Sequence, residues 1–189
     1  TNFKRIAGDI CSKKTFLSDV NIIKIKNAVV SEIITKNPKQ QHYLNFKKKI
    51  LTRNEKVITT SCGFTFYWQN YFNNLTKSDV ITSSLCCLDN KRKIYKDNEI
   101  LIFTFNEEIL KTLLVSKLKT PFKGHILGLR KYHLLYKIIF NNEKNFEFEK
   151  ICYELKQLLW ETIKNLKIQL IILECTNLSP YKNIFRNIF

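Results

Sequence analysis

One carboxylate stands inside an apolar stretch near the C-terminal end of the sequence. The residues Leu-Ile-Ile-Leu at 170–173 are followed by Glu174, and a Ser-Pro-Tyr segment at 179–181 comes shortly after. A carboxylate buried among apolar side chains must be paired, shifted in pKa or used in chemistry, because burying the charge alone is costly. Glu174 is therefore the first candidate for acid–base chemistry. Strict alternation along a strand also allows it to face solvent, with Leu173 and Cys175 pointing inward.

The six cysteines and three histidines do not have the spacing of a metal site. No two cysteines form a C-x-x-C pair. Cys86 and Cys87 are adjacent, and on a strand they would point to opposite faces, which suits neither chelation nor a mutual disulfide. The residues around the cysteines are apolar or typical of strands, so most of the thiols are interpreted as small core side chains. We expect no bound metal, and reduced thiols favour a cytoplasmic protein.

The composition is that of one globular domain over residues 1–189. Apolar residues make up 44% and charged residues 25%, and both values are ordinary for a folded protein. The net charge of +16 would attract nucleic acid or an anionic substrate. The lysine excess comes with abundant Asn and Ile, however, and all three residues are inflated by an AT-rich genome. We therefore expect no specific nucleic-acid partner.

The sequence shows no signal for a membrane-bound protein. No apolar stretch reaches the roughly 18 residues that a membrane span requires. The first residues, Thr-Asn-Phe-Lys-Arg, are not followed by the apolar core of a signal peptide. We expect a monomer in the cytoplasm.

The order of the predicted elements indicates an α+β fold. Helical spacing and capping residues predict helices over 18–36, 40–53, 106–118 and 146–166. Runs rich in β-forming residues predict strands over 57–68, 80–88, 94–105, 125–140 and 167–176. The strands follow one another like hairpins, with a turn expected at residues 89–91, and helices gather near the N-terminus. This order favours a single domain with an antiparallel sheet and helices on one side.

Three segments resemble those of the chorismate pyruvate-lyase family, and together they cover about residues 40–182. The first, Lys-Val-Ile-Thr-Thr-Ser-Cys-Gly-Phe at 56–64, is similar to the family's first strand, which also closes on Gly-Phe. The second joins Leu-Cys-Cys-Leu-Asp-Asn at 85–90 to the Lys-Thr-Pro-Phe-Lys-Gly turn at 119–124. The third has Trp160, the apolar run ending in Glu174, and the Ser-Pro-Tyr segment, all in register with the family.

The resemblance implies an antiparallel sheet that encloses a buried ligand pocket. It also implies a reaction in which chorismate loses its enolpyruvyl ether, giving 4-hydroxybenzoate and pyruvate without a cofactor, as the first step of ubiquinone biosynthesis. Such a site needs cationic or N–H donors for two carboxylates, a donor at the leaving enolpyruvate, and a carboxylate base of raised pKa.

The resemblance assigns roles to four residues. Glu174 matches the family's pocket glutamate, and the backbone N–H of Phe122 matches the donor of the family's Thr-Pro turn. Thr82 stands where the family has a carboxylate-binding arginine. Lys96 lies near a second family arginine and can replace it as a point charge, although Lys96 also fits a solvated surface lysine. Arg130 and Lys131 are further sources of positive charge for the substrate.

Two other functions remain open beside the lyase. A protein of the same fold can bind a small aromatic acid without converting it. A basic nucleic-acid-binding domain is the third alternative, and its affinity would fall steeply with salt. Turnover distinguishes the lyase from both.

Overall fold

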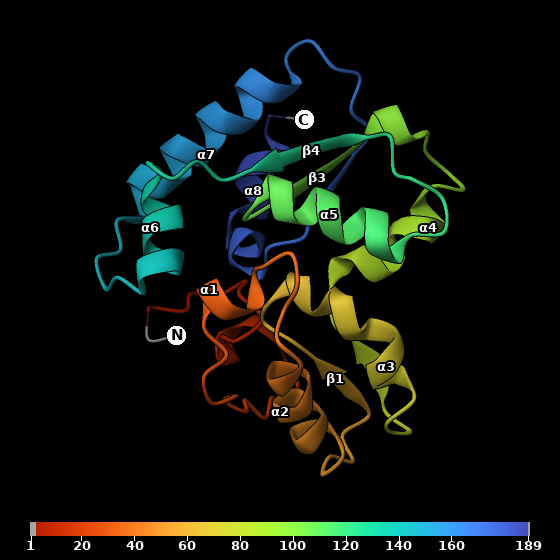
Figure 1. The fold of residues 1–189 in the computed structure, drawn as a ribbon. Helices are drawn as coiled ribbons and strands as arrows, with labels where there is room; N and C mark the ends of the chain where they lie inside the picture. The colour runs from red at the N-terminus through yellow and green to blue at the C-terminus, as the bar shows by residue number, and fades with distance from the viewer. Residues whose placement is uncertain (1–2, 189) are drawn as a thin grey trace.

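The computed structural model describes residues 3–188 (Figure 1). Its strands are β1 (Val57–Thr59), β2 (Asp79–Ile81), β3 (Ile100–Thr104), β4 (His125–Gly128) and β5 (Leu170–Leu173). Its α-helices are α1 (Val30–Ile33), α2 (Gln40–Ile50), α3 (Gln69–Asn73), α4 (Leu88–Lys91), α5 (Glu107–Lys117), α6 (Leu134–Asn141), α7 (Phe148–Ile163) and α8 (Lys182–Arg186). Its 3₁₀ helices are η1 (Lys13–Thr15), η2 (Gly63–Trp68), η3 (Ser84–Cys87), η4 (Asp97–Glu99) and η5 (Thr176–Tyr181).

The fold is mixed α and β, as predicted, but every strand pair in residues 3–188 is parallel rather than antiparallel. β1 pairs with β2 in one sheet, and β3 lies between β4 and β5 in the other. Parallel strands need crossover connections, and the helices between successive strands supply them. The hairpin turn expected at residues 89–91 is instead part of helix α4.

Several predicted strands are helical over much of their length. Residues 63–68 form η2, so the first predicted strand ends at Thr59. The predicted strand over 125–140 ends at Gly128, and α6 follows it. The buried residues of α6 recur at helical spacing: Leu134, Leu135, Ile138 and Ile139. A short apolar run has nearly the same appearance in a strand and in a buried helix, which explains this error.

Helices α5 and α7 confirm the predictions over 106–118 and 146–166. Asn106 begins α5, and its side-chain Oδ1 accepts a hydrogen bond from the backbone N–H of Ile109 at 3.0 Å. Helix α7 buries one stripe of side chains: Ile151, Leu155, Leu158, Leu159 and Ile163. Capping and periodicity are local signals, so the sequence alone is enough to show them.

The cap at Asn106 predicts a moderate loss of stability in the Asn106→Ala variant. Without the side-chain acceptor, the N–H of Ile109 loses its partner at the start of α5. We expect the free energy of unfolding to fall by about 1 kcal/mol, measured by urea denaturation. The Asn106→Asp variant keeps the acceptor and should stay within about 0.5 kcal/mol of the wild type.

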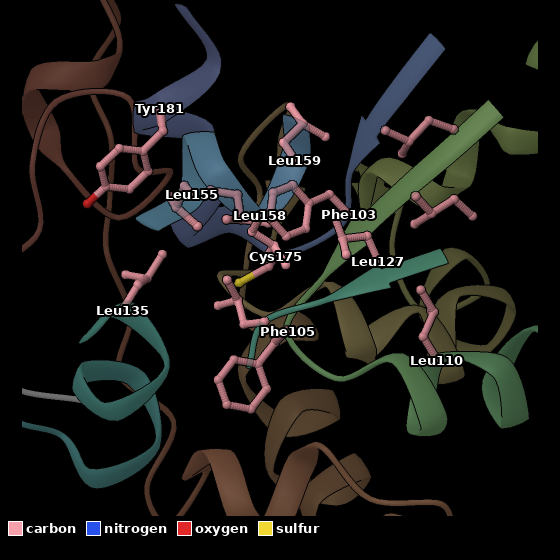
Figure 2. Packing of buried hydrophobic residues seen from close by; sticks show 14 of the residues in the cluster. Phe103, Phe105, Leu110, Leu127, Leu135, Leu155, Leu158, Leu159, Cys175 and Tyr181 are labelled. Atoms are coloured by element: carbon pink, nitrogen blue, oxygen red, sulfur yellow. The ribbon is translucent and has the colours of Figure 1, made fainter. Parts of the chain in front are cut away.

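The three-stranded sheet is covered on both faces. All five residues of β3 are buried. Right-handed crossovers place α5 on one face and α7 on the other, because β4 and β5 lie on opposite sides of β3. Figure 2 shows Phe103 of β3 beside Leu158 and Leu159 of α7, with Leu110 of α5 beyond Leu127 of β4. The expectation of helices on one side was therefore wrong.

The chain forms two lobes within one domain. The N-terminal lobe, residues 28–83, carries β1 and β2 and occupies the lower half of Figure 1. It has its own apolar cluster, made of Ile33, Phe46, Ile50, Trp68, Phe72 and Val80. The C-terminal lobe, residues 84–188, holds the larger cluster around β3, which Phe3 and Phe64 also join. No helix within residues 3–188 has both the length and the apolar character to cross a membrane.

Candidate active site at the junction of the two sheets

Glu174 lies at the carboxyl ends of β3 and β5. The strand order β4-β3-β5 makes this edge the point where successive crossovers leave in opposite directions. In open parallel sheets, ligands bind outside the carboxyl ends of the strands at such a point. The backbone N–H of Glu174 donates to the carbonyl of Phe103 at 2.9 Å, which extends the strand pairing by one residue. The sheet therefore fixes the backbone of Glu174 at the position where this fold class places ligands.

The carboxylate of Glu174 is buried and only partly satisfied. Its side chain belongs to a residue that is 1% exposed, and the hydroxyl of Thr104 donates to Oε2 at 2.6 Å. Among the described residues, Oε1 has no hydrogen-bond partner. Burial raises the pKa of Glu174 to about 7, although the bonds from Thr104 and the Phe105 backbone oppose this shift. Near neutral pH this carboxyl group can give up or accept a proton.

The N-terminal lobe closes over Glu174 through residues 61–63. The hydroxyl of Thr176 donates to the carbonyl of Ser61 at 2.7 Å. Gly63 packs so closely that an added Cβ would overlap Oε1 and the carbonyl oxygen of Glu174. Just after the N-terminal lobe ends, the hydroxyl of Ser84 donates to the carbonyl of Leu173 at 2.8 Å, which ties the connection between the lobes to the end of β5. Residues 61–63 and 174–176 therefore face each other across the junction.

Two thiols occupy the middle of these facing segments. Cys62 lies between Ser61, which contacts Thr176, and Gly63, which contacts Glu174. On the facing segment, Cys175 lies between Glu174 and Thr176. Both thiols are free, with Cys175 buried and Cys62 partly buried. Burial and then the Glu174 charge raise the pKa of Cys175 to about 12, and the same two causes raise the pKa of Cys62. The charge of Cys175 also raises the pKa of Cys62.

The two cysteines occupy equivalent positions in two similar units. Cys62 is the N-cap residue of the six-residue η2, which runs directly into the five-residue α3. Cys175 is the N-cap residue of the six-residue η5, which runs into the five-residue α8. Each unit follows the carboxyl end of a parallel strand, β1 or β5. The junction thus brings together two matching strand–turn–helix units, each with its thiol at the turn.

Thr82 lies close to the junction, but its side chain serves the N-terminal lobe. Its backbone N–H and its hydroxyl both donate to the side-chain Oε1 of Gln69, the former at 2.8 Å. Its carbonyl accepts a hydrogen bond from Thr60 at 2.8 Å. Thr82 is fully buried and has its polar groups satisfied by neighbours in its own lobe. It is not free to bind a substrate carboxylate in this arrangement.

Lys96 and Phe122 lie at the opposite edge of the sheet from Glu174. Lys96 precedes β3 and Phe122 precedes β4, so both are near the amino ends of the strands. The turn before Phe122 is held by Arg92, which donates to the carbonyls of Thr120 at 3.0 Å and Pro121 at 2.9 Å. The structure therefore does not bring Lys96 and Phe122 together with Glu174.

Arg130 and Lys131 follow the carboxyl end of β4, on the same edge as Glu174. Both are exposed, and the Arg130 guanidinium lies 3.8 Å from the carboxylate of Glu107. They can add positive potential outside the junction, but they do not line it.

In the part of the chain that the structure describes, the expected buried ligand pocket is not present around Glu174. Two open depressions lie elsewhere on the surface, and neither includes this residue. One is lined by Asp89, Arg92, Lys93, Tyr95, Lys96, Asp97 and Thr120, and the other lies between α7 and α8. Within residues 3–188, no group of three His, Cys, Asp or Glu side chains is arranged to hold a metal ion.

Glu174 was predicted from the sequence as a site residue, whereas the two cysteines beside it were not. A local signal was present, since Cys62 is flanked by Ser61 and Gly63, and Cys175 by Glu174 and Thr176. A core cysteine usually has apolar neighbours, whereas these two follow strands and have polar or small neighbours. The convergence itself depends on the fold, because residues 61 and 176 are 115 positions apart.

Comparisons of this chain with protein-family models, with curated proteins and with solved structures find no match.

Proposed function

We propose that the protein is a thiol-dependent isomerase that inverts the configuration of a small carbon acid. The observation that carries this proposal is the convergence of Cys62 and Cys175, from equivalent positions in the two units, on one junction. Two thiols on opposite sides of a bound molecule can exchange a proton with each of its two faces. A carboxylic acid with one hydrogen on its α-carbon is the simplest substrate for such a pair.

The reaction needs one thiolate and one thiol. The thiolate takes the proton from the α-carbon, so a C–H bond breaks and an S–H bond forms. The opposite thiol gives its proton to the other face of the planar carbanion, so its S–H bond breaks and a C–H bond forms. The two thiols thereby exchange their charge states, and nothing is oxidised or reduced. General acid–base catalysis of this kind contributes about 10² to 10⁴ in rate.

The closed junction keeps both thiols protonated, since burial and the Glu174 charge disfavour a thiolate. Separation of the lobes admits water, which returns a thiol toward its ordinary pKa of about 8.5. The same water lowers the pKa of Glu174 from about 7 toward its ordinary value, so Glu174 is then a carboxylate that can relay the thiol proton to solvent. Closure around the substrate restores a dry site in which hydrogen bonds to the carbanion are strong.

Deuterium exchange tests the proposal directly. Single enantiomers of α-amino acids and 2-hydroxy acids are incubated with the protein in D₂O. Deuterium at the α-carbon is followed by mass spectrometry, and inversion by chiral chromatography. We expect exchange with inversion for at least one substrate, and its loss in the Cys62→Ser and Cys175→Ser variants.

The matched control for this test is Cys86→Ser, which removes an exposed cysteine from η3. This variant should keep the wild-type rate. Absence of exchange with every substrate in the panel would contradict the isomerase, as would full activity in the Cys62→Ser/Cys175→Ser double variant.

A chorismate lyase is the second proposal, and the carboxyl group of Glu174 supports it. A base buried in apolar surroundings with a pKa of about 7 is what the ring-proton abstraction requires. We rank it second because Lys96 and Phe122 lie at the other edge of the sheet. Incubation with chorismate, followed by detection of 4-hydroxybenzoate, tests it. Production that is lost in Glu174→Gln and kept in Cys62→Ser would favour the lyase over the isomerase.

A further inference from the structure

The N-terminal segment, residues 3–15, packs against the unit that carries Cys175. Gly8 adopts a φ of +96° and lies so close to Pro180 of η5 that an added Cβ would be 2.7 Å from the Pro180 Cα. Phe3 is buried in the larger apolar cluster. In Figure 2 the reddish N-terminal chain runs beside Tyr181, at the end of η5. This segment is therefore part of the wall behind the Cys175 thiol.

A chain of hydrogen bonds leads from this segment to the thiol. Nη1 of Arg5 donates to Oδ1 of Asn177 at 2.9 Å and to Oδ2 of Asp9 at 2.8 Å. Nδ2 of Asn177 donates in turn to Sγ of Cys175 at 3.7 Å. A cation bound to the amide oxygen polarises the amide, so its N–H becomes a stronger donor to sulfur. The positive charge of Arg5 is thereby relayed to Cys175.

Cys62 has a different set of donors. The groups that favour its thiolate are the backbone N–H groups of Phe64 and Thr65. For Cys175, both the backbone and the side chain of Asn177 have this effect. Only on the Cys175 side, among the contacts of the described residues, does a side-chain donor connect the sulfur to an arginine. The two thiols are thus equivalent in position but not in electrostatic support.

We propose that Arg5 and Asn177 are positioning residues that make Cys175 the thiolate of the pair, a proposal that rests on the isomerase function. Cys175 then removes the substrate proton in one direction of the reaction, and Cys62 starts as the acid. The relay remains with Cys175 when the lobes separate, because residues 3–15 and η5 belong to the same side of the junction.

The other charges that face Cys175 oppose its ionisation. Glu174 precedes it in the chain, and Asp9 approaches from the N-terminal segment; both charges raise the pKa of Cys175. Arg5 also neutralises part of the Asp9 charge through their ion pair. Loss of Arg5 therefore removes a favourable relay and uncovers an unfavourable charge at the same time.

Site-resolved alkylation measures the relay without any substrate. The folded protein reacts with iodoacetamide between pH 6.5 and 10, and peptide mass spectrometry follows the rate at each cysteine. The ratio of the Cys175 rate to the Cys62 rate cancels the lobe opening that both thiols share. We expect Arg5→Gln and Asn177→Ala to lower this ratio by about threefold to tenfold at pH 8, and to move the Cys175 profile to higher pH.

Two further variants separate a positioning role from a structural one. Arg5→Lys keeps the charge and should recover part of the ratio. Arg53→Gln removes an arginine that pairs with Glu55 in the N-terminal lobe and should leave the ratio unchanged. An unchanged ratio in both Arg5→Gln and Asn177→Ala would overturn the relay, including the case in which both cysteines react faster by the same factor. The alkylation rates are measured without substrate, so this test is independent of the turnover assay. An unchanged ratio would contradict the relay without contradicting the isomerase, and the ratio can still be measured if the protein shows no turnover.

Discussion

Gly63→Ala will lose about 3 kcal/mol of unfolding free energy, near the upper end of the effects of overpacking a well-packed site. The added methyl group would overlap Oε1 and the carbonyl oxygen of Glu174, and it would lie 2.8 Å from the carboxyl carbon of that residue. Side-chain rotation alone cannot relieve this clash, because one of the atoms is backbone. Urea denaturation measures the loss. We also expect faster alkylation of Cys62 and Cys175 in this variant, since the lobes can no longer close.

Two companion variants show whether the clash is the cause. Gly128→Ala makes the same chemical change, but its Cβ would be 2.9 Å from the backbone nitrogen of Glu107, so a smaller loss is expected. The double variant Gly63→Ala/Glu174→Ala removes the carboxylate and keeps the carbonyl, and it should not recover wild-type closure. Wild-type stability and thiol protection in Gly63→Ala would show that the two segments do not pack this closely.

Glu174→Gln should remove a pH dependence of about 3 kcal/mol from the stability of the protein. In the unfolded chain the carboxyl group loses its proton near pH 4.5, whereas burial in the folded protein holds that proton until about pH 7. Between these values the folded state binds one more proton than the unfolded state. The free energy of unfolding therefore falls as pH rises through this window, by about 1.4 kcal/mol per pH unit for a single group.

The measurement is the difference in unfolding free energy between Glu174→Gln and the wild type, taken from pH 4 to 8.5 at constant ionic strength. The difference cancels other titrating groups, including His133, whose pKa burial lowers. The Gln side chain has an amide group without a hydrogen-bond partner in place of Oε1, and this changes the unfolding free energy of the variant by the same amount at every pH. The change of the difference with pH therefore reports the titration of Glu174. A flat difference across pH 4.5–7 would show that Glu174 is solvated in the folded protein.

A control at Thr104 tests the environment of the carboxylate. The Thr104 hydroxyl donates to Oε2 and so favours the charged form. Thr104→Val should raise the pKa of Glu174 further and extend the pH-dependent window above 7. Spectroscopic titration of the carboxyl group, by ¹³C NMR, reads this shift directly.

Local patterns predicted the parts of the fold that depend on local physics. The cap at Asn106 and the apolar stripe of α7 fixed two helices from sequence alone. The direction of strand pairing was predicted wrongly because it depends on whether a hairpin or a crossover connects the strands. In addition, the residues of α6 were interpreted as part of a strand. The short apolar run of α6 fits a buried strand or a buried helix equally well, and only tertiary packing decides between the two.

The candidate site was predictable at one residue for the same reason. A carboxylate after an apolar run is unusual in itself, so Glu174 could be found without any knowledge of its neighbours. The two thiols are unremarkable singly. They become candidates only because residues 61–63 contact residues 174–176 in the fold, and no short-range sequence pattern predicts that contact.

The separate apolar cluster of the N-terminal lobe has a consequence for how the chain folds. Its members fall between Ile33 and Val80, so the lobe can collapse on contacts that are short in sequence. The junction needs residue 176, near the end of the chain, to reach residue 61. During synthesis the N-terminal lobe therefore emerges and compacts first, with Cys62 and Gly63 at an unfinished boundary. The chemistry-bearing centre is completed last, in the step that joins the two halves.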